Sequence, residues 1–286
     1  MHNFMIIKFN YKFITVILSL CLVILFISSE FIAKTPVGAS GEIHLPIIMY
    51  HHISADEKAL NDYVISPTEL ESDFSMIKKL GYTAILPAQL IDYTEKGVPL
   101  PGNPIMITFD DGFESVYHYA YPLAEKYGLK FTVAIYGKET ERFSECNDHN
   151  ILYSYMTRDE IKELSESGIC EIANHTYSLH GMSERKGIKK NKNEDVSSYE
   201  KVVSEDLMHL QRVLSELDIS PLAFVYPYGF FCKHSECLIE KLGFKVSFIC
   251  TEGVNRITQN PDCLYNLKRY NRPHGISTEY FFNKLK

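Results

Sequence analysis

Two adjacent carboxylates stand where an apolar run of the sequence ends. Asp110 and Asp111 follow the run 105–109 and precede Gly112. Neighbouring carboxylates repel each other unless a cation or a shared proton compensates their charge, so the pair indicates a metal site. The same three residue types also form ordinary turns and helix N-caps. The pair alone does not decide between these interpretations.

Two histidines follow a second candidate strand. His175 comes directly after residues 171–174, and His180 lies five positions later. A single histidine is more often an ordinary surface or core residue, but two histidines with Asp111 provide the three ligands of a catalytic zinc, whose fourth position stays open for water. The same ligands also suit Co²⁺, Ni²⁺ or Mn²⁺, so the sequence leaves the metal open.

A third polar segment, Tyr226-Pro227-Tyr228-Gly229, ends the run 222–226. A turn of this composition often does no more than close a buried strand. It can also direct the backbone N–H of Tyr228 at the negatively charged oxygen that develops during acyl transfer, while the two tyrosines line a substrate site. Tyr226, Pro227 and Tyr228 are therefore candidate substrate or oxyanion residues.

A regular alternation of helices and strands must bring these segments together. Two predicted helices begin with capping-box patterns at Ser66 and Thr157. Four predicted helices end at a glycine suited to a C-cap, and an apolar run follows each of them: Gly81, Gly128, Gly168 and Gly243. The polar stretches 137–155 and 185–198 interrupt this alternation, and we predict that both are surface loops.

Seven apolar runs are candidate strands. Several are apolar throughout, which is typical of parallel strands covered on both faces. The pattern predicts a parallel α/β barrel or a doubly wound sheet, in which ligand sites lie at the carboxyl ends of the strands. The runs are 46–50, 83–86, 105–109, 130–136, 171–174, 222–226 and 245–250.

The N-terminal region has the composition of an export signal. Residues 13–27 are uncharged and apolar, and Lys8 and Lys12 precede them. We predict a signal that is either cleaved after the small residues 37–39 or retained as a membrane anchor. Residues 1–39 would then form the signal or anchor segment, and residues 40–286 one catalytic domain that is secreted or held on the outer face of the membrane.

The charge and cysteine content of residues 40–286 limit the possible partners. Three of the 29 basic and one of the 36 acidic residues lie before position 40, so the rest carries 26 basic and 35 acidic residues, a net charge of −9. This excess of acidic residues does not favour nucleic acid as a partner. Six cysteines remain in the domain, and an exported protein could form disulfides from them.

Taken together, these segments resemble the polysaccharide deacetylase family, the NodB-homology domains of carbohydrate esterase family four. The resemblance extends from about residue 45 to the C-terminus and implies a distorted (β/α) barrel with about seven parallel strands. It implies that Asp110 is the general base, and that a divalent metal, zinc first among the candidates, is bound by three ligands: Asp111, His175 and His180. The five-residue spacing of the histidines is similar to that of the branch acting on poly-N-acetylglucosamine.

Other features of the family are displaced or absent. Val225 replaces the arginine that usually begins the third motif, so Arg269 or Arg272 would have to substitute for it. The sequence contains no Trp, and His274 is the candidate general acid. A Tyr-His segment resembling the family's first strand places His51 as a residue expected to line the cleft.

The resemblance implies metal-dependent hydrolysis of N-acetyl groups on an extracellular amino-sugar polysaccharide. Poly-N-acetylglucosamine, peptidoglycan and a chitin-like polymer are the candidate substrates. The alternatives are an O-acetyl esterase acting on a wall glycan and a non-catalytic surface protein that binds glycan. Acetate release from N-acetylated and O-acetylated sugars would separate the three interpretations.

Overall fold

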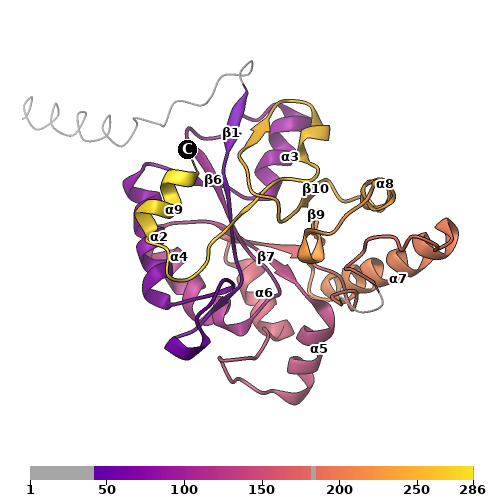
Figure 1. The fold of residues 1–286 in the computed structure, drawn as a ribbon, viewed down its shortest axis with the longest axis horizontal. Helices are drawn as coiled ribbons and strands as arrows, with labels where there is room; N and C mark the ends of the chain where they lie inside the picture. The colour runs from indigo at the N-terminus through magenta and orange to yellow at the C-terminus, as the bar shows by residue number, and fades with distance from the viewer. Residues whose placement is uncertain (1–41, 182–184, 286) are drawn as a thin grey trace, which may run out of the picture. The chain divides into compact units, whose positions relative to one another are not determined.

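A computed structural model describes residues 42–181 and 185–285 (Figure 1). The predicted export or anchor segment, residues 1–39, lies outside the described residues. Among the residues that are described, none of the helices is long and apolar enough to cross a lipid bilayer.

A parallel sheet forms the centre of the fold, as the continuous apolar runs predicted. Seven of its strands are hydrogen-bonded in the order β10-β9-β8-β7-β6-β2-β12, and β5 pairs with the beginning of β6. The strands are β2 (Ile47–Tyr50), β5 (Thr83–Ala84), β6 (Pro104–Phe109), β7 (Phe131–Ile135), β8 (Cys170–Asn174), β9 (Ala223–Val225), β10 (Val246–Phe248) and β12 (Tyr270–Asn271).

The sheet curls into a distorted barrel. An isolated parallel bridge joins Phe248, at the end of β10, to Leu267, which lies just before β12. This bridge connects the outermost strand β10 to the segment that leads into β12, at the other end of the sheet. The structure therefore confirms the parallel α/β barrel predicted from the sequence. Two shorter ribbons lie outside it, β1 (Ile43–Leu45) with β11 (Asn255–Ile257) and β3 (His52–Ile53) with β4 (Val64–Ile65).

Helices cover the sheet, and their ends follow the predicted signals. Both capping boxes form, at Ser66 and at Thr157, and the four C-cap glycines have φ between 57° and 91°. Figure 1 shows α2, α4 and α9 side by side. The helices are α2 (Pro67–Lys79), α3 (Pro87–Lys96), α4 (Tyr121–Tyr127), α5 (Gly137–Cys146), α6 (Arg158–Glu166), α7 (Val196–Ser215), α8 (Lys233–Lys241) and α9 (Thr278–Lys284).

Both stretches predicted to be loops are partly helical. The prediction for 137–155 is wrong over its first half, where α5 forms and buries Thr140 and Phe143 on one face. Those residues are three positions apart, as one face of a helix requires, but the charged residues around them obscured the pattern. The prediction for 185–198 is wrong at its end, where α7 begins.

The strands of the barrel are buried on both faces. Along β6, Ile105, Ile107 and Phe109 pack in one hydrophobic cluster, whereas Met106 packs in another. Alternate side chains of a strand point to opposite faces, so both faces of β6 need apolar residues. This double burial explains why the sequence of the strand is apolar throughout rather than alternating.

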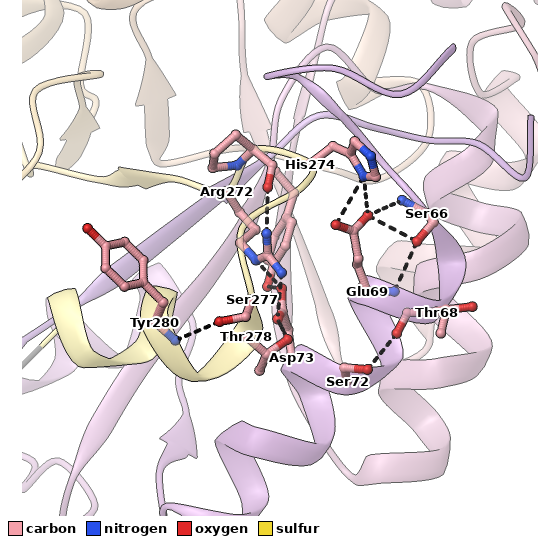
Figure 2. Close-up of polar contacts among 12 residues, drawn as sticks. Ser66, Thr68, Glu69, Ser72, Asp73, Arg272, His274, Ser277, Thr278 and Tyr280 are labelled. Carbon is pink, nitrogen blue, oxygen red and sulfur yellow. Dashed lines mark hydrogen bonds and ion pairs between the residues drawn. The ribbon is translucent and has the colours of Figure 1, made fainter. Parts of the chain in front are cut away.

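A buried ion pair joins the C-terminal segment to α2 (Figure 2). Asp73 of α2 and Arg272 are both fully buried, and Nε of Arg272 donates to Oδ2 of Asp73 at 2.7 Å. The Tyr50 hydroxyl donates to the same oxygen at 3.1 Å, and Thr278 Oγ1 donates to Oδ1 at 2.6 Å. Four elements, β2, α2, α9 and the segment after β12, therefore share one carboxylate.

We expect Asp73→Ala to lower the free energy of unfolding by about 3–5 kcal/mol, because it leaves the buried guanidinium of Arg272 without its counter-charge. The measurement is urea unfolding of the full-length chain. Asp92→Ala is the control, because Asp92 pairs with Lys96 on the surface of α3 and an exposed pair contributes about 1 kcal/mol or less. Equal losses in the two variants would contradict the structural role of Asp73.

Candidate active site

A cavity of about 650 Å³ opens where the carboxyl ends of β2, β6, β8 and β9 meet. The three polar segments identified in the sequence each contribute to its lining, because they follow parallel strands whose carboxyl ends share one rim. The lining residues are Met49, His51, His52, Tyr63, Val64, Asp110, Asp111, Phe113, His175, His180, Tyr228, Phe230, Cys250 and Asn271.

Asp111, His175 and His180 converge in this cavity. Oδ1 of Asp111 lies 3.4 Å from Nε2 of His175 and 3.1 Å from Nε2 of His180. The two Nε2 atoms are 3.1 Å apart. One carboxylate oxygen and two ring nitrogens thus surround a single point, and the predicted ligand residues form a group that could hold a metal ion.

The hydrogen bonds of these ligands fit a divalent cation. Nδ1 of His175 lies 2.8 Å from the carbonyl oxygen of Val225. This bond places the ring proton on Nδ1 and leaves the lone pair of Nε2 directed at the point shared with Asp111 and His180. Two such nitrogens at 3.1 Å repel each other unless a cation or a proton lies between them. The donor set is the three-ligand arrangement of catalytic zinc sites.

Strained backbone conformations hold these side chains at the strand ends. Asp111, Thr176 and Tyr228 have φ of 71°, 73° and 56°, in the left-handed region that non-glycine residues rarely adopt. Each such residue costs roughly 1–3 kcal/mol and persists only where the surrounding structure enforces it. All three lie in the turns that carry the chemistry, directly after β6, β8 and β9.

Asp110 points into the same cavity but is paired differently. Arg269 donates to both of its carboxylate oxygens, at 2.6 and 2.7 Å, and also donates to the carbonyl oxygen of Ile249. Burial alone would raise the pKa of Asp110, but the Arg269 guanidinium beside it holds that pKa below its usual range. Asp110 is therefore ionised at neutral pH. Of the two arginines considered from the sequence, Arg269 contacts it, whereas Arg272 binds Asp73.

The third segment contributes one residue to the cavity surface. Tyr228 lines the cavity, and its hydroxyl lies 3.3 Å from Nδ1 of His180. Tyr226 does not reach the cavity, because its side chain is fully buried in a separate hydrophobic cluster behind the turn. Pro227 is also buried and starts the 3₁₀ turn Pro227–Gly229. A side chain at Gly229 would place Cβ 2.7 Å from the backbone nitrogen of Cys250, so the turn requires glycine here.

Comparison with known protein families shows which family this chain belongs to. The family described as polysaccharide deacetylase matches residues 97–247, more than half of the 286-residue chain and all three polar segments. The chain belongs to the polysaccharide deacetylase family. The match confirms the family predicted from the motifs and makes the protein an enzyme, a hydrolase that deacetylates polysaccharide.

Individual relatives agree with the assignment. This polysaccharide deacetylase is 28% identical over 212 residues to the poly-beta-1,6-N-acetyl-D-glucosamine N-deacetylase of Staphylococcus aureus, which covers 74% of this chain and 69% of the relative. Among solved structures, the de-N-acetylase from Aggregatibacter actinomycetemcomitans superposes with a TM-score of 0.70 at 22% identity, covering 85% of this chain and 100% of that chain. IcaB from Ammonifex degensii gives 0.68 at 24% identity, covering 87% and 98%. These structures show the same fold.

The two other histidines predicted for this deacetylase occupy different places. His51 lines the cavity, with its Nε2 4.0 Å from Oδ2 of Asp110. His274 lies outside the residues that line the cavity, and its Nδ1 is 2.9 Å from Oε2 of Glu69 at the start of α2 (Figure 2). That contact helps to lower the pKa of Glu69 to about 2, against the opposing effect of burial. The geometry therefore gives no support to His274 as the general acid.

Several residues that line the deacetylase cavity escaped prediction. Three of them adjoin the recognised motifs, and three come from segments without one: His52, Phe113 and Phe230 in the first group, and Tyr63, Cys250 and Asn271 in the second. A position next to a motif, such as that of His52 directly after His51, was the one available signal. Nδ1 of His52 lies 2.8 Å from the Ser115 hydroxyl, which in turn accepts a hydrogen bond from the backbone N–H of Ile53.

The six cysteines of the domain are all free thiols in the structure, so the disulfides considered from the sequence do not form there.

Proposed function

We propose that this polysaccharide deacetylase removes N-acetyl groups from an extracellular polymer of N-acetylglucosamine, with the β-1,6-linked polymer as the first candidate. The arrangement of Asp110 beside the Asp111, His175 and His180 ligand group carries the proposal. The S. aureus relative is named for that polymer, and the five-residue spacing of the histidines supports the same branch. The apolar run 13–27 supports export, with residues 40–286 as a catalytic domain that is secreted or anchored in the membrane.

In the proposed mechanism the three ligands hold one divalent ion, most simply Zn²⁺. When bound, such an ion lowers the pKa of a water molecule and polarises the acetyl carbonyl. Asp110 accepts the proton of the attacking water, while the bidentate contact with Arg269 keeps its carboxylate ionised and oriented. The backbone N–H of Tyr228 is the proposed donor to the negatively charged oxygen that develops on the acetyl group.

The leaving amine needs a proton from another group. His51 replaces His274 in this proposed role, because it lines the cavity and lies 4.0 Å from Asp110, whereas His274 is bonded to Glu69. Nδ1 of His51 is buried and has no hydrogen-bond partner among the described residues. The ring packs edge-on against Tyr63, and its Nε2 is the nitrogen that lies beside Asp110. Burial lowers the pKa of His51, and the carboxylate of Asp110 opposes that effect.

We expect His51→Ala to reduce turnover by about 100-fold or more, in the range for loss of a general acid, and His274→Ala to change it by no more than about twofold. The two variants serve as controls for each other, because each removes one imidazole. The measurement is acetate release from oligomers of N-acetylglucosamine. A larger loss in His274→Ala than in His51→Ala would return the acid role to His274.

One assay tests the function as a whole. The full-length chain is incubated with β-1,6-linked N-acetylglucosamine oligomers, peptidoglycan or an O-acetylated xylan oligomer, with and without a chelator. We expect acetate from the first substrate, its loss with the chelator and its return with added Zn²⁺. Acetate from the xylan oligomer alone would identify an O-acetyl esterase, and acetate from peptidoglycan alone would make peptidoglycan the substrate. No acetate from any of the three would contradict the proposed function.

A further inference from the structure

A second group of potential ligands lies outside the active-site cavity. It consists of Glu114, which follows β6, His149 in the irregular segment 147–155, and Glu160 in the first turn of α6. Nδ1 of His149 lies 2.8 Å from Oε1 of Glu114 and 3.9 Å from Oε1 of Glu160. One atom from each residue lies within 4.8 Å of the others.

One oxygen of the Glu114 carboxylate is not satisfied by the protein around it. Glu114 is 8% exposed, and its Oε2 has no hydrogen-bond partner among the described residues. A buried acceptor without a partner costs about 1–3 kcal/mol, and a charged one costs more. Oε1 of the same carboxylate contacts His149 at 2.8 Å, so the buried group with the unsatisfied oxygen is part of the cluster. A bound cation is one partner that would satisfy it.

The other two residues are already oriented toward the same point. Oε2 of Glu160 accepts bonds from the backbone and the hydroxyl of Thr157, so Oε1 is the oxygen that remains for His149. Nε2 of His149 lies 3.4 Å from Oδ1 of Asn147. A hydrogen bond at the other ring nitrogen is the usual way in which a protein orients a histidine that binds a metal.

We propose that Glu114, His149 and Glu160 bind a second divalent transition-metal ion. One imidazole and two carboxylates suit Zn²⁺, and also Mn²⁺, Co²⁺ or Ni²⁺. The ion would join three segments that surround the active site. Glu114 donates its N–H to the carbonyl oxygen of Ser154, and Phe113, which lines the cavity, forms a β-bridge with Tyr155. The second ion therefore fixes segment 147–155 against the cavity lining and takes no part in the chemistry.

The proposal is tested by measuring the number of zinc ions bound per chain in a variant whose catalytic metal site is disrupted. The full-length chain with His175→Ala is stripped with a chelator, equilibrated with Zn²⁺ and analysed for bound metal. We expect it to keep one ion per chain, and the double variant His175→Ala/His149→Gln to keep none. Asp148→Asn in the same background is the matched control. Asp148 is the neighbouring residue, and among the described residues its carboxylate accepts hydrogen bonds only from Asn150 and Tyr153. This control should keep the ion.

The counts can also overturn the proposal. A His175→Ala chain without zinc, or a double variant that still binds it, would show that the cluster is only an ion pair between Glu114 and His149. These results would leave the proposed deacetylase function intact, because that function depends on the site built by Asp111, His175 and His180.

A second measurement depends on local structure rather than on metal content. Amide hydrogen exchange in residues 147–155 of the otherwise unchanged chain should slow by about tenfold or more when Zn²⁺ is added, because opening this segment would then require release of the ion. The same slowing is expected in Asp148→Asn and not in His149→Gln. Equal slowing in the two variants, or no slowing in the unchanged chain, would refute the second site.

Discussion

Asp110→Asn is expected to reduce turnover on N-acetylglucosamine oligomers by about 100- to 10,000-fold, the usual cost of removing a general base. The amide is nearly the same size as the carboxylate but cannot accept the proton of the attacking water. Asp111, His175 and His180 remain in place, so the variant should bind as much metal as the unchanged chain. Acetate release and metal content, measured on the same preparation, check both parts of this prediction.

Loss of stability could imitate loss of catalysis in this variant. Arg269 is fully buried, and removal of the charge from Asp110 leaves the guanidinium uncompensated, at a cost of about 3–5 kcal/mol. The double variant Asp110→Asn/Arg269→Met should recover much of that stability, because it replaces the remaining charge by an apolar side chain. It should stay inactive. Recovery of activity in the double variant would show that folding, and not the base, limited the single variant.

Two outcomes would reassign Asp110. If Asp110→Asn loses metal, the residue is a ligand and the roles of the two aspartates must be exchanged. If turnover is unchanged, the base lies elsewhere and the proposed mechanism is wrong.

His175→Ala is expected to lose one metal ion per chain and its deacetylase activity together. Removal of an outer partner of a metal ligand weakens affinity about 10- to 100-fold, and removal of the ligand itself should cost more. The measurement is metal content after dialysis at a fixed concentration of free Zn²⁺, followed by acetate release. His118→Ala is the control, because His118 is exposed and packs edge-on against Tyr119. Unchanged metal content in His175→Ala would show that the ligand set is misassigned.

Local signals in the sequence were sufficient to predict a parallel α/β fold, either a barrel or a doubly wound sheet, and to place the candidate ligand residues at strand ends. The resemblance to the polysaccharide deacetylase family implied the barrel. Several of the predicted strands are continuous apolar runs, and glycine C-caps mark where four helices end. Asp111 and His175 directly follow buried strands, so any parallel arrangement would place them at one rim of the sheet. These features depend only on residues that are close together in the chain, so a single sequence is enough to predict them.

Contacts between residues far apart in the chain could not be predicted from the sequence in the same way. Arg269 and Arg272 are three positions apart around the two-residue strand β12, so they face opposite sides of the chain. One reaches Asp110 and the other reaches Asp73, and only the register of β12 against β2 decides which. His274 was selected as the late histidine of the chain, but the turn after Pro273 directs it to Glu69.

The contact between Asp110 and Arg269 also sets when the enzyme can first become active. The two residues are 159 positions apart. The barrel can therefore close only after the C-terminal segment that carries Arg269 has joined the rest of the folding chain. Until then β2 has no β12 to pair with, and the barrel remains open with an unpaired, aggregation-prone strand edge. A partly folded chain of this protein is therefore inactive, and it exposes an unpaired strand edge until its C-terminal strand pairs with β2.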